Sequence, residues 1–131
     1  MTWSIYAESF SIYIKTSEAT GLQLDWGLAK ALELKPSIGR NSLSAFVQYK
    51  KAGCDFFRAV KHTDPDLCVW LMSKIQIAQQ ATDGEWRVAA FCEKGKKHKA
   101  HGKTLAEAVA RCVIAMRLGD DFECPDELEG V

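Results

Sequence analysis

The sequence predicts an α+β domain, a three-layer α/β/α sandwich in which a small, mostly antiparallel sheet carries helices on both faces. Three observations predict it. Helix-like and strand-like periods alternate along 131 residues, a length that suits a single domain over residues 1–131. Asp83-Gly84 joins two strand-like runs and is typical of a hairpin turn. The second run is apolar on both faces, as expected of a central strand covered on two sides.

In the first third of the chain, the period of the apolar residues changes from two to that of a helix. Residues 3–15 are rich in aromatic and β-branched types, and Phe10, Ile12 and Ile14 alternate with other residues, which predicts a half-buried strand. The apolar residues of 20–34 fall on one stripe and predict a helix. Pro36 ends this helix, because the residue before a proline leaves the helical region.

The middle of the chain is predicted to hold two helices and a strand. Residues 36–41 are expected to form a loop, and Asn41 then looks like the N-cap of a short helix that Gly53 ends. Residues 54–62 fit a helix or a strand equally well. Asp64, followed by a proline, is typical of a helix start, and residues 73–80 follow as a strand.

The C-terminal half has the clearest pattern. In residues 85–93, Trp86, Val88, Ala90 and Cys92 share one face of a strand, whereas Ala89 and Phe91 share the other. Residues 96–101 follow as an edge strand that lysines protect from pairing with other chains.

A capping box starts the last predicted helix. The Thr104 hydroxyl and the Glu107 carboxylate are placed to satisfy free amides of its first turn, and Gly119 ends the helix. The remaining segment, residues 119–131, is acidic and is expected to be a peripheral tail.

Composition narrows the functional classes. The 17 basic and 17 acidic residues cancel, so no overall charge directs the protein to nucleic acid or membrane. The five cysteines are an odd number, so they cannot all form pairs, and they are spread without short repeats. This pattern indicates reduced thiols. With no leader-like start and no run of about 18 apolar residues, the expected location is the cytoplasm.

A basic segment is the main candidate binding site. Clustered cations beside a helix N-terminus favour phosphate, and by extension nucleic acid. The alternative is a solvated, protected strand edge, since the segment has no interleaved aromatic residue and the acidic tail is able to neutralise it. Its residues are Lys94, Lys96, Lys97, His98, Lys99, His101 and Lys103.

Metal and catalytic sites are not expected. Cys92, His98 and His101 are the residue types of a zinc site, but the Cys-x-x-Cys spacing is missing. A pairing of Cys54 with His62 has no activated-thiol motif around it, and no glycine-rich phosphate loop is present. No catalytic residue, metal or cofactor is therefore predicted.

Both ends of the chain resemble a known family. Residues 16–31 contain Gly21, Leu24 and Asp25, and residues 102–128 run from Gly-Lys-Thr through an alanine-rich helix to Gly-Asp and Pro-Asp-Glu-Leu. Together with residues 83–91, this pattern resembles the phage ABA sandwich family, small proteins of tailed phages and prophages without an assigned biochemical role. The match departs in residues 62–74. The resemblance implies helices on both faces of a small sheet and a place in the cytoplasm of an infected bacterium.

The function predicted from the sequence is that of a phage or prophage accessory protein. It is expected to bind a host macromolecule, such as a defence component, or a small ligand, without catalysis. The first alternative is nucleic-acid binding through residues 94–103. The second alternative is a small hydrolase or nucleotide-handling enzyme. Neither the partner nor the oligomeric state follows from the sequence.

Overall fold

A computed structural model describes residues 11–128 of the chain. Residues 3–10 of the predicted first strand and the last three residues of the acidic tail lie outside this range. The described elements are β1 (Ser11–Lys15), η2 (Thr16–Glu18), α1 (Leu22–Ala31), β2 (Ser37–Arg40), β3 (Ala45–Lys50), β4 (Phe57–Ala59), α2 (Pro65–Met72), β5 (Ile77–Gln80), β6 (Trp86–Phe91), β7 (Lys97–Gly102), α3 (Leu105–Leu118), β8 (Asp121–Pro125) and η3 (Asp126–Leu128), where η marks a 3-10 helix.

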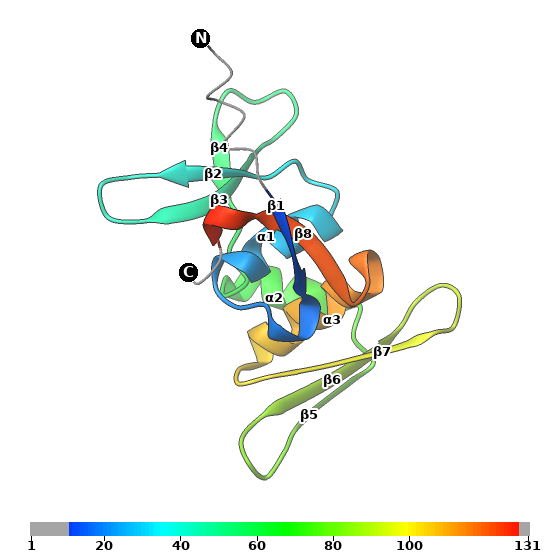
Figure 1. Cartoon of the computed structure of the whole chain (residues 1–131). Helices are drawn as coiled ribbons and strands as arrows, with labels where there is room; N and C mark the ends of the chain where they lie inside the picture. The colour runs from blue at the N-terminus through cyan, green and yellow to red at the C-terminus, as the bar shows by residue number, and fades with distance from the viewer. Residues whose placement is uncertain (1–10, 129–131) are drawn as a thin grey trace.

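The α+β class and the antiparallel pairing are confirmed, but the described strands form three small sheets instead of one (Figure 1). β1 pairs with β8, β2–β3–β4 form a second sheet, and β5–β6–β7 form a third, with every pair antiparallel. Along the chain, α2 lies between the two three-stranded sheets.

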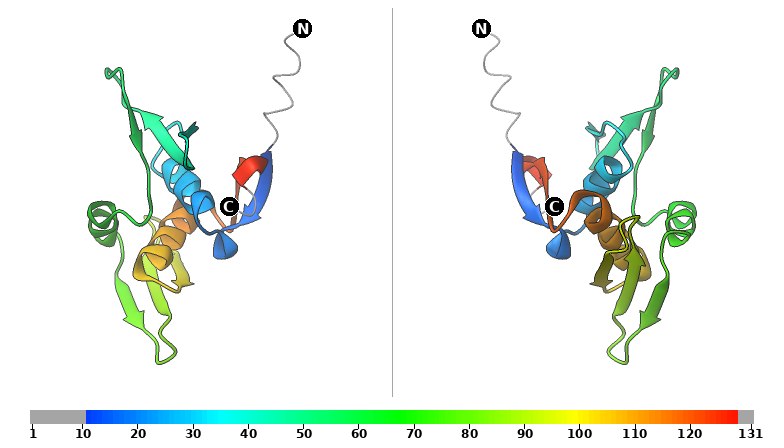
Figure 2. Two further views of the ribbon diagram at one scale, coloured as in Figure 1. Left: turned by 90° about the vertical axis from the view of Figure 1, so that its left-hand side faces the viewer. Right: turned by 90° about the vertical axis from the view of Figure 1, so that its right-hand side faces the viewer.

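The layers are stacked around two central helices (Figure 2). α1 and α3 pack against each other and cover the inner faces of the two three-stranded sheets, α1 on β3 and α3 on β6 and β7. β1 and β8 lie on the opposite side of these helices. α2 lies on the far side of the sheets, near where they meet, and reaches α3. Because α2 does not cover the face of the β5–β6–β7 sheet, part of that outer face is open to solvent.

α3 forms as its sequence predicts. The Thr104 hydroxyl oxygen accepts a hydrogen bond from the Glu107 backbone N–H at 3.1 Å, and the Glu107 carboxylate accepts one from the Lys103 backbone N–H at 3.1 Å. Gly119, at φ 98°, ends the helix in a conformation that favours glycine. Seven consecutive residues, from Ala108 to Ile114, are buried, so α3 is enclosed on nearly all sides.

The predicted helix after Asn41 is wrong: this segment contains the turn that joins β2 to β3, and then β3 itself. The Asn41 carboxamide accepts from the backbone N–H groups of Leu43 and Ser44, both at 2.8 Å, which closes a turn instead of capping a helix. In β3, Val47 is buried and Tyr49 is partly buried against the core, a spacing of two that fits a strand. Asparagine favours both uses, so tertiary pairing decides.

Three other segments of the middle can be compared with the prediction. The expected loop at residues 36–41 contains β2, and the ambiguous segment at residues 54–62 contains the short strand β4. The predicted strand at residues 73–80 is shorter, since only β5 is extended. The helix start at Asp64 is confirmed, because its carboxylate accepts from the Asp66 backbone N–H at 3.0 Å.

The acidic C-terminal segment is not peripheral. β8 pairs along its whole length with β1, and the side chains of Phe122 and Cys124 are buried against the helices. Leu128 in η3 is also buried. The acidic residues of β8 alternate with the buried apolar ones, so the high negative charge of the segment does not reveal that it is a half-buried strand. Among residues 11–128, no helix has the length and apolar character needed to cross a membrane.

Candidate functional site

The open outer face of the β5–β6–β7 sheet gathers cationic side chains next to apolar ones. Because side chains alternate along a strand, Lys97, Lys99 and His101 of β7 share this face. Their cross-strand neighbours on β6 are Phe91, Ala89 and Arg87, respectively. The outer face of β5 adds Ile77 and Gln79 through its register with Ala89 and Arg87. We call this set, Ile77, Gln79, Arg87, Ala89, Phe91, Lys97, Lys99 and His101, the basic face.

The structure divides the seven residues of the predicted basic site. Lys97, Lys99 and His101 lie on the basic face, and Lys94 and Lys96 are exposed in the turn that joins β6 to β7. The other two lie elsewhere. His98 faces the opposite side of β7 and is partly buried, with its carbonyl 3.6 Å from the Cys112 thiol. Lys103 follows the strand and donates its backbone N–H to Glu107.

The basic face also contains residues that the sequence did not assign to the site. Phe91 is 48 % exposed and Ile77 is 40 % exposed, high values for large apolar side chains. The strand pattern assigns Phe91 to the face opposite Trp86, but only the register of β6 with β7 places it beside Lys97. A shallow hollow of about 420 Å³ lies on this face, with Ile77, Ala89 and Lys99 among its lining residues. Cations and an exposed aromatic ring therefore share one surface.

The charges of this face are balanced at one end only. Arg87 lies 3.9 Å from a carboxylate oxygen of Asp83, and the His101 ring lies 3.7 Å from that of Glu85. Within residues 11–128, neither Lys97 nor Lys99 forms an ion pair. Exposed pairs of this kind contribute little and are easily exchanged. The lysine end therefore carries positive charge that no direct ion pair in the described residues neutralises.

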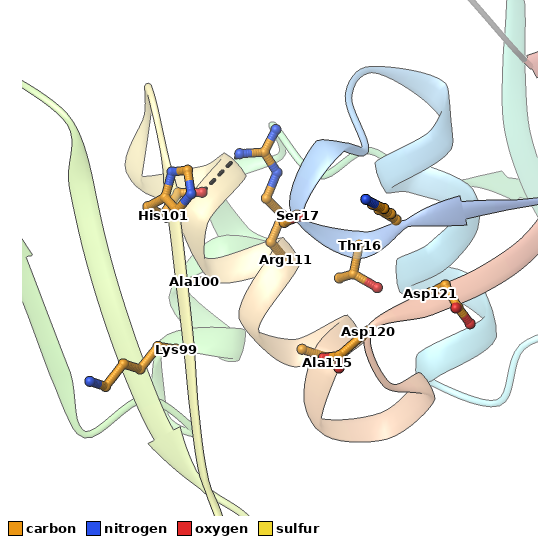
Figure 3. Close-up of a pocket in the computed structure, with 10 residues that line it drawn as sticks. Thr16, Ser17, Lys99, Ala100, His101, Arg111, Ala115, Asp120 and Asp121 are labelled. Atoms are coloured by element: carbon orange, nitrogen blue, oxygen red, sulfur yellow. Dashed lines mark hydrogen bonds between the residues drawn. The ribbon is translucent and has the colours of Figure 1, made fainter.

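The acidic C-terminal segment does not pair with the lysines in the described part of the chain. Its Glu127 carboxylate forms an ion pair with Arg40 at the other end of the molecule. Asp120 and Asp121 line a second hollow of about 280 Å³ across β7 (Figure 3). Thr16 and Arg111 also line it, as do Lys99 and His101, which border both hollows. In this view, the Lys99 side chain points away from Arg111.

Arg111 in this second hollow has a structural role. Its guanidinium donates to the Ala19 carbonyl through Nε and Nη2, at 3.1 and 2.9 Å. It also donates to the His101 carbonyl through Nη1, at 2.8 Å, as Figure 3 shows. Glu107 lies 3.2 Å from the same guanidinium. Because these groups occupy most of its donors, Arg111 joins α3 to β7 and to the segment before α1 instead of offering a free cation.

A second buried polar pair links distant segments. The Asp25 carboxylate on α1 accepts a hydrogen bond from the backbone N–H of His62 and lies 2.7 Å from its ring Nδ1. Both side chains are largely buried. From the sequence, His62 was considered only as a partner of Cys54. Asp25 was missed, because it lies 37 positions away and no local pattern relates the two residues. The pair fastens the segment before α2 onto α1.

The cysteines and histidines do not converge on a metal site. His98 and His101 lie on opposite faces of β7, which separates two of the three residues considered for zinc. Among residues 11–128, no group of three or more potential metal ligands is found. Burial raises the pKa of the Cys112 thiol to about 11 and raises that of Cys68 as well. High pKa values disfavour the reactive thiolate.

Comparison with known proteins assigns no family to this chain. No protein-family model matches the sequence. No curated protein matches it either.

Proposed function

We propose that this protein is a phage or prophage accessory protein that acts by binding, in the cytoplasm of an infected bacterium. Its binding surface is the basic face, and its partner is an anionic macromolecule of the host. The observation that carries the proposal is the pair Lys97 and Lys99, exposed without an ion pair in the described chain beside the half-exposed Phe91.

Local charge is the basis of this proposal. The whole chain is neutral, so long-range attraction to an anion is weak. At close range, Lys94, Lys96, Lys97 and Lys99 are exposed on one end of a hairpin. A partner with several anionic groups contacts several of these cations at once, and release of its counterions favours binding. Lysines on a strand edge also prevent aggregation, and that role is compatible with binding.

Heparin-affinity chromatography tests the proposal with a generic polyanion. The double variant Lys97→Glu/Lys99→Glu is expected to elute at a clearly lower salt concentration than the wild type. Lys50→Glu/Lys51→Glu is the matched control, because both lysines are exposed and lie on or next to β3, on the other sheet. Equal shifts for the two double variants, or no retention of the wild type, would contradict the proposal.

A protein partner is the second candidate, favoured by the exposed side of α2. Trp70 is 52 % exposed, Val69 is more exposed still, and Lys74 lies 4.8 Å from the Trp70 ring centroid. Exposed aromatic residues are typical of protein-binding surfaces. Affinity purification from host lysate distinguishes the candidates. A stoichiometric protein lost with Trp70→Ser but retained with Lys97→Glu/Lys99→Glu would favour this one.

A further inference from the structure

We infer that the partner of the basic face is a single-stranded nucleic acid, one base of which stacks on Phe91; this inference rests on the proposed function. A single strand offers both kinds of group that the face complements. Its phosphates are anionic, and its unpaired bases have free apolar faces that stack on aromatic side chains.

The order of side chains on the sheet matches that chemistry. Phe91 and Lys97 are cross-strand partners, so their side chains leave the sheet next to each other on the same face. One step further along the same face, Ala89 faces Lys99. The small alanine leaves room for the hollow of about 420 Å³ that Ile77 also lines. The face thus has the apolar residues Ile77, Ala89 and Phe91 on β5 and β6, and two lysines on β7.

This division gives each part of a nucleotide its own place. The base lies on Phe91 or over the alanine floor, and the sugar–phosphate chain follows the edge strand β7, past Lys97 and Lys99. β7 is at the edge of its sheet, so no further strand of this sheet lies beyond it. At the far end of the hollow, the exposed Gln79 side chain has both donors and an acceptor for a base edge.

A duplex fits the same face poorly. The major groove of DNA admits an α-helix or a two-stranded ribbon, whereas this face is three strands wide. Paired bases also hide the ring faces that Phe91 would contact. An acidic polypeptide would pair with the lysines, but it has no group that specifically requires Phe91. Duplex DNA and acidic polymers therefore serve as the alternative ligands in the test.

Fluorescence anisotropy with the full chain tests the inference. The probe is a labelled oligothymidylate of about 16 nucleotides, near the upper limit of common single-strand sites. Phe91→Ala is expected to weaken binding about 5- to 100-fold, as for the loss of one stacked base. Phe91→Trp is expected to bind as tightly as the wild type or tighter, and Phe91→Leu to bind as weakly as Phe91→Ala. This pattern separates stacking from simple apolar contact.

Phe57→Ala is the matched control, because Phe57 is 53 % exposed on β4 of the other sheet. It is expected to leave the affinity unchanged, and the Phe91→Trp and Phe91→Leu pair remains informative if Phe91→Ala does not fold. Equal or tighter binding of a duplex of the same length, or equal affinity for all Phe91 variants, would overturn the inference. Heparin retention that depends on Lys97 and Lys99, without binding of the oligonucleotide, would overturn it while leaving the proposed function intact. Absence of binding to either probe would overturn both.

Discussion

At the scale of single residues, Arg111 connects more distant parts of the chain than any motif in the sequence indicates. Its contacts with the carbonyls of Ala19 and His101 span 92 and 10 positions along the chain. Ala19 is fully buried, so its carbonyl has little access to water. A buried acceptor without a donor costs about 1–3 kcal/mol.

Arg111→Lys is therefore expected to lower the free energy of unfolding by about 2–4 kcal/mol. The compact lysine ammonium lacks the planar fork of the guanidinium and cannot reach both carbonyls. Urea unfolding measures the change. Arg117→Lys is the control, because the exposed Arg117 makes a single contact of 3.4 Å with the Ala31 carbonyl. The same unfolding midpoint for both variants would show that the Arg111 contacts contribute little.

Cys112 makes the free energy of unfolding depend on pH in the alkaline range. Burial raises the pKa of its thiol from 9.0 to about 11, so the folded state holds the proton more tightly than the unfolded state. The corresponding stability is fully present below about pH 9 and is lost as the pH rises through about 11. The wild type's advantage over Cys112→Ala in unfolding free energy is expected to shrink across this interval. Urea unfolding at several pH values measures it, and a constant difference would contradict the assignment.

At the scale of elements, Gly102 sets how closely β7 approaches α3. A Cβ atom at this position would lie 2.8 Å from the Ala108 backbone nitrogen, a contact that only a shift of the backbone relieves. At Gly27, a Cβ would meet the ends of the Ile114 and Phe122 side chains, which move more easily. The two glycines thus differ in what an added methyl group displaces.

Gly102→Ala is expected to destabilise the protein by about 1–3 kcal/mol through overpacking. Gly27→Ala is expected to cost less, because alanine also favours the helix by about 1 kcal/mol. Thermal or urea unfolding of both variants gives the comparison. The opposite order, or wild-type stability of Gly102→Ala, would show that β7 and α3 separate without cost.

Local signals predicted those elements whose termini are determined by their own residues. Thr104, Glu107 and Gly119 give α3 its bounds through short-range hydrogen bonds and backbone conformation, and the sequence predicted them correctly. Asn41 was ambiguous, because the same side chain caps helices and closes turns. The pairing of β2 with β3 decides between the two. The side chain of Asn41 alone does not contain that information, although the spacing of Val47 and Tyr49 fits a strand.

At the scale of the whole molecule, the site depends on pairings between segments. The sequence predicted the basic segment, but it gave no reason to place Phe91 beside Lys97 or Ile77 opposite Ala89; the register does. Likewise, the pairing of β8 with β1 buries Phe122 in a segment that charge alone assigns to solvent. The composition of a segment can be read from its own residues, whereas the burial of its side chains depends on which other segments pack against it.

The same arrangement explains why the basic face is open. α3 covers the inner side of the β5–β6–β7 sheet, and α2 lies near its junction with the β2–β3–β4 sheet (Figure 2). The outer side thus keeps its exposed apolar and cationic side chains together. The central claim is that this face binds single-stranded nucleic acid through phosphate contacts by Lys97 and Lys99 and stacking on Phe91.

The salt dependence of oligothymidylate affinity tests this claim most directly. For single strands, each phosphate contact contributes about 0.7 to the slope of log affinity against log salt. Lys97→Ala/Lys99→Ala is therefore expected to reduce the magnitude of that slope by about 1.4, whereas Phe91→Ala weakens binding with the slope unchanged. Lys50→Ala/Lys51→Ala is expected to match the wild type. An unchanged slope in Lys97→Ala/Lys99→Ala, or an equal reduction in the control, would contradict the claim.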